Sequence, residues 1–483
     1  MASSALFFTI FSVLFICQTS CNCTPSVERH SIQLSQLVGY DDAPASTPVQ
    51  PISWTGRRGK GEDAILLELR RLWQWDQRRH KRRLKSDIAR VAFLQSLVSK
   101  HEQHAGKSID TADGARVPLT SGRKLDTLNY VTRIGIGSQQ MSVLVDTGSD
   151  LTWVQCSPCT YCYQQQDSLY NSSLSSSYIP IACNSSACGS FEMSAGCASA
   201  STCAYDVGYG DGSYTRGDLV RDTLMIGTDT IGGFLFGCGH NNRGLFGGAA
   251  GLLGLGRSPP SLISQTFAKY NGVFSYCLPS AHETSGSLIL GNSSFTFAYN
   301  TTPFVYTSMF QHPQVPTFYL LHLIGITVGG VYINASSPSP ADVSSSGRTL
   351  IDSGTVITRL GPSLYKSVKD EFVKQAAEFP SAPSFSILDT CFNLSGFTEV
   401  SIPTLQFHFS NGGGIVGSDV QVNVDASGIM YVVKKDASQV CMALASLRRE
   451  DEFAIMGNYQ QQNLRIIYDV KESKVGFAPE VCR

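Results

Sequence analysis

Short apolar runs separated by turn residues dominate the chain after about residue 117. The run 130–136 alternates apolar and polar positions, as a half-buried strand does. Two further apolar runs, 143–145 and 350–351, each deliver an aspartate into a turn that contains glycine. Long amphipathic helices are scarce in this part of the chain. The pattern therefore predicts a mainly β body.

The N-terminal part has three patterns of its own. An apolar run at residues 5–16, followed by small polar residues, is typical of a secretory signal peptide, which we assign to residues 1–23 although a basic leader is missing. Residues 24–60 are rich in Pro, Ser and Gly, which predicts a loosely structured segment. From Glu62 to about His101 the pattern becomes helical, with one apolar face that comprises Leu84, Ile88, Val91 and Val98.

Charge separates this helical segment from the body. Residues 57–107 hold 14 Lys and Arg against 6 Asp and Glu, whereas the whole chain has a net charge of −1. A basic helical segment between a signal peptide and an acidic body indicates a removable propeptide, residues 24–115; a permanent helical subdomain is the alternative. No aromatic-interleaved binding motif accompanies the basic residues, so a nucleic-acid partner is not expected. No later run is apolar enough for a membrane anchor.

The two aspartates give the 483-residue chain its organisation, because they lie in two copies of one motif. Asp146 begins Asp-Thr-Gly-Ser, and Asp352 begins Asp-Ser-Gly-Thr 206 residues later. This length suggests two or three units, and the repeat suggests two similar lobes that present one carboxylate each at a shared cleft. The residues expected to support the carboxylates are Thr147, Gly148, Ser149, Ser353, Gly354 and Thr355.

Two carboxylates at one site predict acid–base chemistry. Like charges a few ångströms apart repel, so the pair tends to hold one proton between them. One carboxyl can then deprotonate a water while its partner stabilises the oxyanion that develops on a carbonyl group; aspartic proteases are the standard example of this chemistry. The chain has no phosphate-binding loop, so a nucleotide cofactor is not expected. Water activation by two carboxyls implies no metal or other organic cofactor.

Twelve cysteines lie in the body, and their even number fits six disulfides in a secreted protein. They are Cys156, Cys159, Cys162, Cys183, Cys188, Cys197, Cys203, Cys238, Cys277, Cys391, Cys441 and Cys482. The spacing of the first three also resembles a zinc site, but no histidine lies within that cluster. Six glycosylation sequons agree with secretion, and they begin at Asn171, Asn184, Asn292, Asn300, Asn334 and Asn393.

Residues 125–483 resemble a pepsin-type aspartic protease, most of all the nepenthesin-like or nucellin-like plant branch. Beyond the two aspartates, Trp153 follows Asp146 by seven residues, and the segment 209–217 matches the flap hairpin of the family. Within that segment the residues expected to contact substrate are Tyr209, Gly210, Asp211 and Gly212, with a hydrogen bond between Tyr209 and Trp153. The segments 251–256 and 454–457 match the two stretches that pack beside the aspartate loops in the family.

This resemblance implies a two-lobed β fold, with an N-terminal lobe at 116–310 and a C-terminal lobe at 311–483. It also implies that the basic segment inhibits the cleft, and that disulfides join Cys391 to Cys441 and Cys277 to Cys482. Ser353 replaces the more common Thr, and Asn458 stands where Asp is frequent. Ser353 keeps the hydroxyl group of Thr, so the geometry should survive. Asn458 lacks the charge of Asp, which could change the acidity of the site.

The expected protein is therefore a monomeric, secreted, glycosylated endopeptidase that is made as a zymogen and cleaves protein or peptide substrates. A non-catalytic binding protein, such as the glycosidase-inhibitor relatives of this family, is the alternative. The apoplast is the expected location, with the vacuole and the plastid as alternatives.

Overall fold

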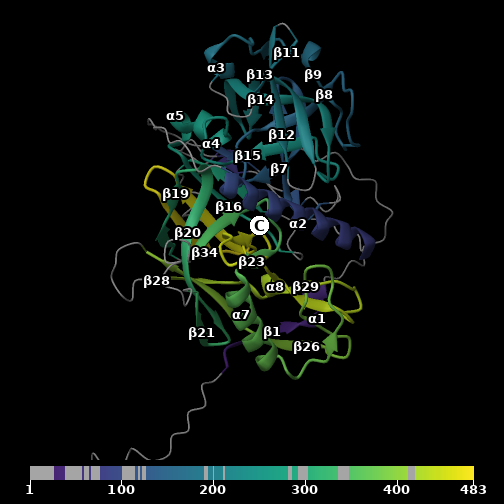
Figure 1. The fold of residues 1–483 in the computed structure, drawn as a ribbon, viewed down its shortest axis with the longest axis vertical. Helices are drawn as coiled ribbons and strands as arrows, with labels where there is room; N and C mark the ends of the chain where they lie inside the picture. The colour runs from purple at the N-terminus through teal and green to yellow at the C-terminus, as the bar shows by residue number, and fades with distance from the viewer. Residues whose placement is uncertain are drawn as a thin grey trace, which may run out of the picture.

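Two β-rich lobes lie one above the other, and a long helix, α2 (Gln77–Lys100), lies between them (Figure 1). The computed structural model describes residues 27–38, 57–58, 65–66, 77–100, 115–117, 120–121, 127–189, 194–199, 201–209, 213–280, 286–291, 303–335, 347–411 and 419–482. The expected signal peptide, residues 1–23, lies outside these ranges. The mainly β, two-lobed architecture expected from the sequence is confirmed.

The N-terminal lobe contains an eleven-stranded sheet among its described residues. Its strands are β5 (Thr120–Ser121), β6 (Tyr130–Ile136), β7 (Gln139–Asp146), β8 (Trp153–Ser157), β9 (Tyr170–Asn171), β10 (Ile179–Pro180), β11 (Ser194–Ser199), β12 (Thr202–Gly208), β13 (Tyr214–Ile226), β14 (Asp229–Arg243) and β15 (Gly251–Gly254). The alternating run predicted at 130–136 forms β6, which pairs antiparallel with β7. The strand β7 ends at Asp146.

A nine-stranded sheet forms the core of the C-terminal lobe, again within the described part of the chain. Its strands are β19 (Phe310–His312), β20 (Val315–Val328), β21 (Val331–Asn334), β22 (Arg348–Asp352), β23 (Thr358–Leu360), β27 (Leu405–Ser410), β28 (Asp419–Asn423), β31 (Leu444–Ser446) and β32 (Ala454–Gly457). The strand β22 ends at Asp352, just as β7 ends at Asp146. Helix α7 (Pro362–Gln375) begins with Pro at its first position, where the missing N–H costs nothing.

The two lobes share a six-stranded sheet, ordered β18 (Val305–Ser308), β34 (Lys474–Pro479), β33 (Leu464–Asp469), β16 (Val273–Cys277), β17 (Ser287–Leu290) and β4 (Ala115–Val117). The strand β33 near the C-terminus pairs with β16 from the first half of the chain. The disulfide Cys277–Cys482 closes this junction. The lobes are therefore continuous through a common sheet, and β4 begins at Ala115, the last residue assigned to the propeptide.

The remaining described elements are short. They comprise β24 (Ser381–Ala382), β25 (Cys391–Phe392), β29 (Met430–Val432) and β30 (Val440–Met442) in one sheet, and the helices η2 (Ser172–Leu174), α3 (Ser186–Gly189), α4 (Leu262–Gln265), α5 (Phe267–Tyr270) and α8 (Ala426–Ile429). Among the described residues, no helix is sufficiently long and apolar to cross a membrane.

The segment 24–60 is more structured than its composition predicted. Residues Arg29–Gln33 form β1, which pairs antiparallel with β26 (Glu399–Pro403) at the edge of the C-terminal lobe, and α1 (Leu34–Val38) follows. Ile32 is buried there, and the Nη2 of Arg29 donates to the carbonyl of Gln375 at 2.6 Å. The partner strand lies about 370 residues away, so local composition could not reveal this pairing.

The helix predicted from Glu62 begins later, at Gln77. Residues 65–66 form the strand β3, which pairs with β2 (Arg57–Arg58) instead of extending the helix. The apolar face of α2 is also shifted: Leu84, Val91 and Leu94 are buried, whereas Ile88 and Val98 are only partly buried. Val91 and Leu94 pack against a cluster of the C-terminal lobe that contains Phe318 and Leu350. This packing fixes α2 in the groove between the lobes.

Candidate active site

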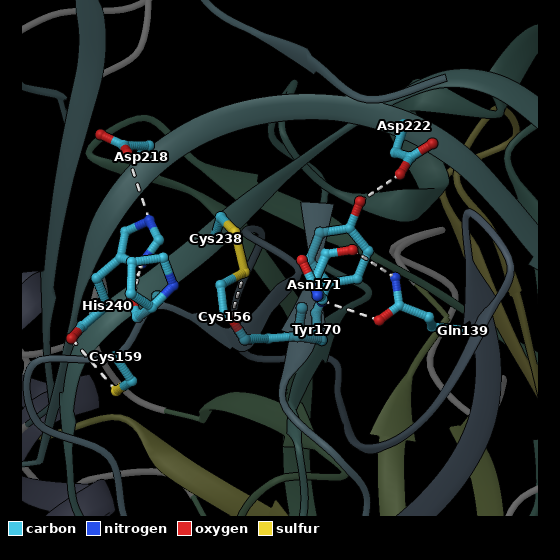
Figure 2. The surroundings of a disulfide bond; sticks show 12 residues. Gln139, Cys156, Cys159, Tyr170, Asn171, Asp218, Asp222, Cys238 and His240 are labelled. Carbon is cyan, nitrogen blue, oxygen red and sulfur yellow. Dashed lines mark hydrogen bonds and ion pairs between the residues drawn. A yellow bond between two sulfur atoms is a disulfide. The ribbon is translucent and has the colours of Figure 1, made fainter. Parts of the chain in front are cut away.

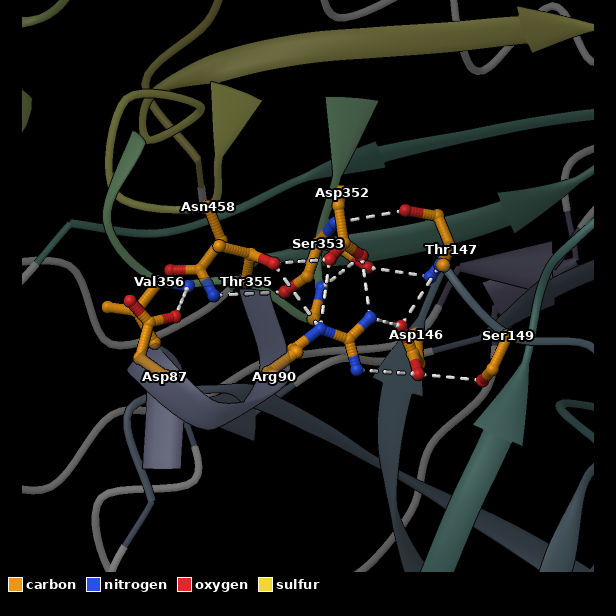
Figure 3. A network of polar contacts seen from close by, with 12 residues as sticks. Asp87, Arg90, Asp146, Thr147, Ser149, Asp352, Ser353, Thr355, Val356 and Asn458 are labelled. Atoms are coloured by element: carbon orange, nitrogen blue, oxygen red, sulfur yellow. Dashed lines mark hydrogen bonds and ion pairs between the residues drawn. The ribbon is translucent and has the colours of Figure 1, made fainter. Parts of the chain in front are cut away.

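Two equivalent turns bring Asp146 and Asp352 together at the lobe junction. Each aspartate ends a buried strand, and each strand has a parallel neighbour that ends in glycine: β15 beside β7 pairs Gly254 with Asp146, and β32 beside β22 pairs Gly457 with Asp352. The two apolar segments that the sequence placed beside the aspartate loops are thus confirmed. Both aspartate side chains are buried, and Figure 3 shows them facing each other.

Reciprocal hydrogen bonds between the lobes lock the two turns. The backbone N–H of Thr147 donates to the hydroxyl of Ser353 at 3.1 Å, and the N–H of Ser353 donates to the hydroxyl of Thr147 at 2.9 Å. The Ser353 hydroxyl in turn donates to the carbonyl of Val145 at 3.2 Å. The substitution of Ser for Thr at 353 therefore keeps the interaction, as expected from the retained hydroxyl.

Each carboxylate has its own pair of donors. Asp146 accepts from the N–H of Gly148 at 3.0 Å and from the hydroxyl of Ser149 at 2.6 Å. Asp352 accepts from the N–H of Gly354 at 2.9 Å and from the hydroxyl of Thr355 at 2.5 Å. The symmetry of these contacts reproduces the symmetry of the two sequence motifs.

The two glycines are required by the close approach of the opposite turn. A Cβ atom on Gly148 would collide with the carboxylate of Asp352, and a Cβ on Gly354 would collide with that of Asp146. Their role is thus to let each backbone lie against the other lobe's carboxylate. Both glycines also lie against Arg90, the residue that fills the remaining space.

Arg90, from the middle of α2, is hydrogen-bonded to both aspartates at once (Figure 3). Its Nε and Nη2 donate to Asp352, each at 2.9 Å, and its Nη1 donates to Asp146 at 3.0 Å, while its Nη2 also contacts Asp146. The guanidinium thus satisfies both carboxylates with charge-assisted hydrogen bonds. No water or substrate carbonyl can occupy the same space.

The electrostatic environment makes the two acids unequal. Burial raises the pKa of Asp146 more than the charge of Arg90 lowers it, and the charge of Asp352 adds to the rise. Burial acts on Asp352 in the same direction, but the charge and hydrogen bonds of Arg90, together with the Thr355 hydroxyl, lower its pKa. Pairs of acids whose pKa values are pushed apart are typical of acid–base sites.

A third buried acid, Asp150, ties the Asp146 loop to the C-terminal lobe. Its carboxylate accepts from the N–H of Ser258 at 2.9 Å and from the hydroxyl of Thr317, in β20, at 2.6 Å. Burial raises the pKa of Asp150 to about 6, against the lowering effect of the Thr317 and Ser258 hydrogen bonds. Asp150 was not among the site residues predicted from the sequence, although it follows Ser149 directly.

The raised pKa of Asp150 predicts a pH-dependent stability. An unfolded Asp releases its proton near pH 4, so between about pH 4 and 6 the folded state binds more protons than the unfolded state. The contribution of Asp150 to stability is therefore present below pH 4 and is lost as the pH rises through 6. We expect the free energy of unfolding of the wild type, relative to Asp150→Asn, to fall by ~3 kcal/mol between these limits.

Urea unfolding at a series of pH values measures this difference. Asp451→Asn is a suitable control, because it removes the same charge from a side chain that is 67% exposed. The prediction would be contradicted if the difference in free energy of unfolding between the wild type and Asp150→Asn stays constant between pH 4 and 6.5.

The flap residues form a hydrogen-bonded aromatic cluster over the site. The strands β12 and β13 make an antiparallel hairpin, and the N–H of Tyr209 donates to the carbonyl of Ser213 at 2.7 Å. The indole N–H of Trp153 donates to the hydroxyl of Tyr209 at 2.9 Å, the contact implied by the family resemblance. Phe93 of α2 packs against the Tyr209 ring. Gly210, Asp211 and Gly212 lie outside the described residues.

Asn458 and Gln461 support the second aspartate loop from behind. The side-chain amide of Asn458 donates to the carbonyl of Ser353 at 2.9 Å, and that of Gln461 donates to the carbonyl of Asp352 at 3.3 Å. An ionised Asp at 458 could only accept hydrogen bonds, so it would lose this contact. The position flagged for its possible effect on acidity thus has a clear role in holding the loop.

All twelve cysteines of the body are paired, which confirms the disulfide interpretation. The pairs are Cys156–Cys238, Cys159–Cys162, Cys183–Cys197, Cys188–Cys203, Cys277–Cys482 and Cys391–Cys441. The last two are those implied by the resemblance. Figure 2 shows Cys156–Cys238, which joins β8 to β14. The zinc alternative required thiolates at 156, 159 and 162, and all three are oxidised in this structure.

Four of the six predicted glycosylation sites lie in the described part of the chain. Asn184 and Asn334 are exposed, and Asn171 and Asn393 are partly exposed. Asn292 and Asn300 lie outside the described residues. Within the described residues, no group of three or more His, Cys, Asp or Glu side chains could hold a metal ion.

Two residues of α2 that contact the site were missed by the sequence analysis. Arg90 contacts both aspartates, and Asp87 contacts the backbone just after Thr355. The sequence had indicated only the overall basic charge of residues 57–107. The spacing of Arg90 relative to the buried positions Leu84, Asp87 and Val91 was the available signal, because these four share one helical face.

A two-lobed β fold with one buried aspartate from each lobe at the junction defines the pepsin-like class of proteins. Residues 130–292 match the family model described as xylanase inhibitor N-terminal, and residues 318–479 match the one described as xylanase inhibitor C-terminal. The chain is 41% identical to an aspartyl protease family protein of Arabidopsis thaliana over 410 residues, 83% of this chain and 82% of the relative. The chain belongs to the plant aspartyl protease family.

Other relatives extend this picture. The aspartic proteinase nepenthesin-1 of Nepenthes gracilis is 36% identical over 363 residues, which cover 73% of this chain and 78% of that protein. The crystal structure of edgp has a TM-score of 0.59 at 20% identity and covers 78% of this chain and 97% of its own. Basic 7S globulin from soybean has a TM-score of 0.58 at 20% identity, with 77% and 96% covered. At these identities the two structures show the fold alone.

Proposed function

We propose that this protein is an aspartic endopeptidase that hydrolyses internal peptide bonds. The observation that carries the proposal is the pairing of Asp146 and Asp352 at the lobe junction, each with a glycine N–H and a hydroxyl donor. Relatives named as aspartic proteases support the same reaction class. Protein or peptide chains are the proposed substrates.

The proposed reaction uses a water held between the two carboxylates. The ionised acid removes a proton from the water as it attacks the peptide carbonyl, and the protonated acid donates to the oxyanion that forms. Proton transfer to the amine then breaks the C–N bond. The donors Ser149 and Thr355 orient the outer carboxylate oxygens, and the pair titrates as one unit. Tyr209 and Trp153 hold the flap that covers an extended substrate.

We further propose that α2 belongs to an inhibitory propeptide. The contact of Arg90 with both aspartates supports this role, because the guanidinium fills the position of the attacking water. The side chains of α2 also cover Tyr209 and the C-terminal half of the cleft. Acid weakens the docking of α2 in the cleft, since protonation of the two carboxylates removes their attraction for Arg90.

Secretion, glycosylation and a monomeric state complete the proposal. Six disulfides and four exposed or partly exposed sequon asparagines in the described residues favour an oxidising compartment such as the apoplast. The vacuole and the plastid are alternative destinations.

The second candidate is a binding protein on the same scaffold. The matched family models carry the name of xylanase inhibitors, which favours this reading. The intact pair of aspartates, their hydroxyl donors and the Tyr209–Trp153 hydrogen bond favour the enzyme instead, because a pure binding surface has no need of them.

Cleavage of an unfolded protein by the processed form, with residues before about 115 removed, tests the proposal. We expect cleavage at pH 4 and little at pH 7. A substrate peptide with a non-cleavable secondary alcohol in place of the scissile carbonyl should inhibit it, because the hydroxyl mimics the tetrahedral intermediate. A matched peptide without the hydroxyl should bind at least about tenfold more weakly. The absence of cleavage by the fully processed protein at both pH values would favour the binding protein.

A further inference from the structure

Beside the aspartate pair, the C-terminal lobe contains a site that holds a carboxylate. Asp87 of α2 occupies it in this structure. One carboxylate oxygen accepts from the N–H of Val356 at 2.6 Å, and the other accepts from the N–H of Ile357 at 3.3 Å and from the Nη2 of Arg359 at 2.7 Å. Figure 3 shows Asp87 pointing at the backbone of Val356 from the helix.

This arrangement is a built anion site and does not depend on the shape of α2. The Nη1 of Arg359 donates to the carbonyl of Ile357 at 2.8 Å, so the lobe itself orients the guanidinium. The side chain of Arg359 is only 4% exposed, and that of Asp87 is fully buried. A buried cation with two aligned N–H groups is costly to leave without an anion. When α2 departs, these three donors lose the acceptor that they have in the precursor.

We propose that the mature cleft uses Val356, Ile357 and Arg359 to bind an acidic side chain of the substrate. This inference rests on the proposed endopeptidase function and adds a substrate class to it, namely peptides with Asp or Glu near the scissile bond. Asp87 in the precursor occupies the position of that side chain, as Arg90 occupies the position of the attacking water.

The spacing of the two α2 residues places the acidic side chain along the substrate. Asp87 precedes Arg90 by three positions, and helical side chains at this spacing lie ~5–6 Å apart at their Cβ atoms. An extended chain advances ~3.3 Å per residue. The acidic residue is therefore expected about two residues from the scissile bond, on one side of it.

The surroundings of the site carry charges of both signs. A cavity of about 510 Å³ next to α2 is lined by Arg359, Arg448 and Arg449, with Glu452 as an acidic neighbour. The carboxylate of Glu452 already accepts from the N–H groups of Arg448 and Arg449, at 2.8 and 3.1 Å. The Nε of Arg449 is also paired with Asp451 at 2.8 Å, so Arg359 is the cation that would attract the substrate carboxylate.

Paired peptides test this inference on the processed protein. Each pair is identical except for Asp or Asn at one position, and the position is moved over three residues on either side of the scissile bond. At pH 5 we expect kcat/KM for the Asp peptide to exceed that for the Asn peptide about tenfold at one position, a usual ratio for a charged hydrogen bond. At pH 3 the peptide carboxyl is largely protonated, and the ratio should approach one.

Variants assign the preference to Arg359. In Arg359→Gln the Asp-to-Asn ratio of kcat/KM should fall to within about twofold. In Arg359→Lys part of the preference should remain, because the positive charge stays while the planar pair of guanidinium donors is lost. A loss of activity that affects both peptides of a pair equally does not change their ratio of kcat/KM. Arg133→Gln removes an exposed cation from the other lobe and should keep the full ratio. If Arg359→Gln does not fold, the pH dependence of the wild type tests the inference instead. The Asp-to-Asn ratio of kcat/KM should then fall toward one between pH 5 and pH 3.

Equilibrium binding separates this inference from the proposed reaction. If no peptide is cleaved, the proposed function fails, but the same peptide pairs can still be titrated against the processed protein by fluorescence anisotropy. Tighter binding of one Asp peptide would then support the carboxylate site. Equal kcat/KM at every position, equal binding of every pair, or a preference that persists in Arg359→Gln would overturn it.

Discussion

Replacing Asp352 by Asn in the processed protein should lower kcat/KM for peptide cleavage by ~10³–10⁴-fold. The amide cannot exchange a proton with water or with the scissile group, so the remaining carboxyl must act alone. The fold should survive, because the Asn oxygen can still accept from the N–H of Gly354, while its NH2 group can donate to the hydroxyl oxygen of Thr355. Asp146→Asn should have an effect of the same size, since the two acids act as a unit.

A surface variant provides the matched comparison for this measurement. Asp370→Asn removes the same charge from the same lobe, at a side chain that is 58% exposed. It should leave kcat/KM within about twofold of the wild type, as expected for an exposed substitution away from the site. Cleavage at more than about a tenth of the wild-type rate by Asp352→Asn, with no contaminating protease, would refute the mechanism.

Replacing Arg90 by Gln in the full-length precursor should weaken the docking of α2 by ~3–5 kcal/mol at neutral pH. The change leaves two buried carboxylates side by side without the cation that satisfies them. At pH 7 a protease should therefore cut residues 77–100 of the variant faster than those of the wild type.

The pH dependence gives this prediction a second test. Arg90 and its hydrogen bonds hold the pKa of Asp352 below its ordinary value, so this contribution is present near neutral pH and is lost as the pH falls through the lowered pKa. The difference between Arg90→Gln and the wild type should thus shrink in acid. Lys85→Gln, an exposed cation on the same helix, should behave as the wild type at both pH values. Equal protection of 77–100 in all three proteins would contradict the role of Arg90.

Much of the site could be predicted from sequence because the reaction geometry is encoded twice. Asp146 and Asp352 lie at the ends of strands whose apolar runs are local, and their glycine partners at 254 and 457 follow at similar spacing. A repeated motif of this kind specifies strand, turn and neighbour together. The cysteine count likewise predicted six disulfides, because the twelve cysteines of the body form an even set that can pair completely.

The contacts of the N-terminal segment could not be predicted in the same way. The strand β1 gains its hydrogen bonds from β26, and Asp87 gains its partners from residues more than 260 positions away. Such pairings depend on the shape of a folded surface, which local periodicity does not describe. Arg90 was one cation among many in a basic segment, and only the three-dimensional position of its helical face distinguishes it.

The sheet shared by the two lobes determines what a single break in the backbone would do. The strands β33 and β34 come from the end of the chain but pair beside β16, and Cys277–Cys482 bonds that end covalently to the first half. A nick in the connection between β17 and β18 would therefore yield two polypeptides that remain one particle. Only reduction together with unfolding would release them, so a cut in this connection would leave the bilobal body in one piece.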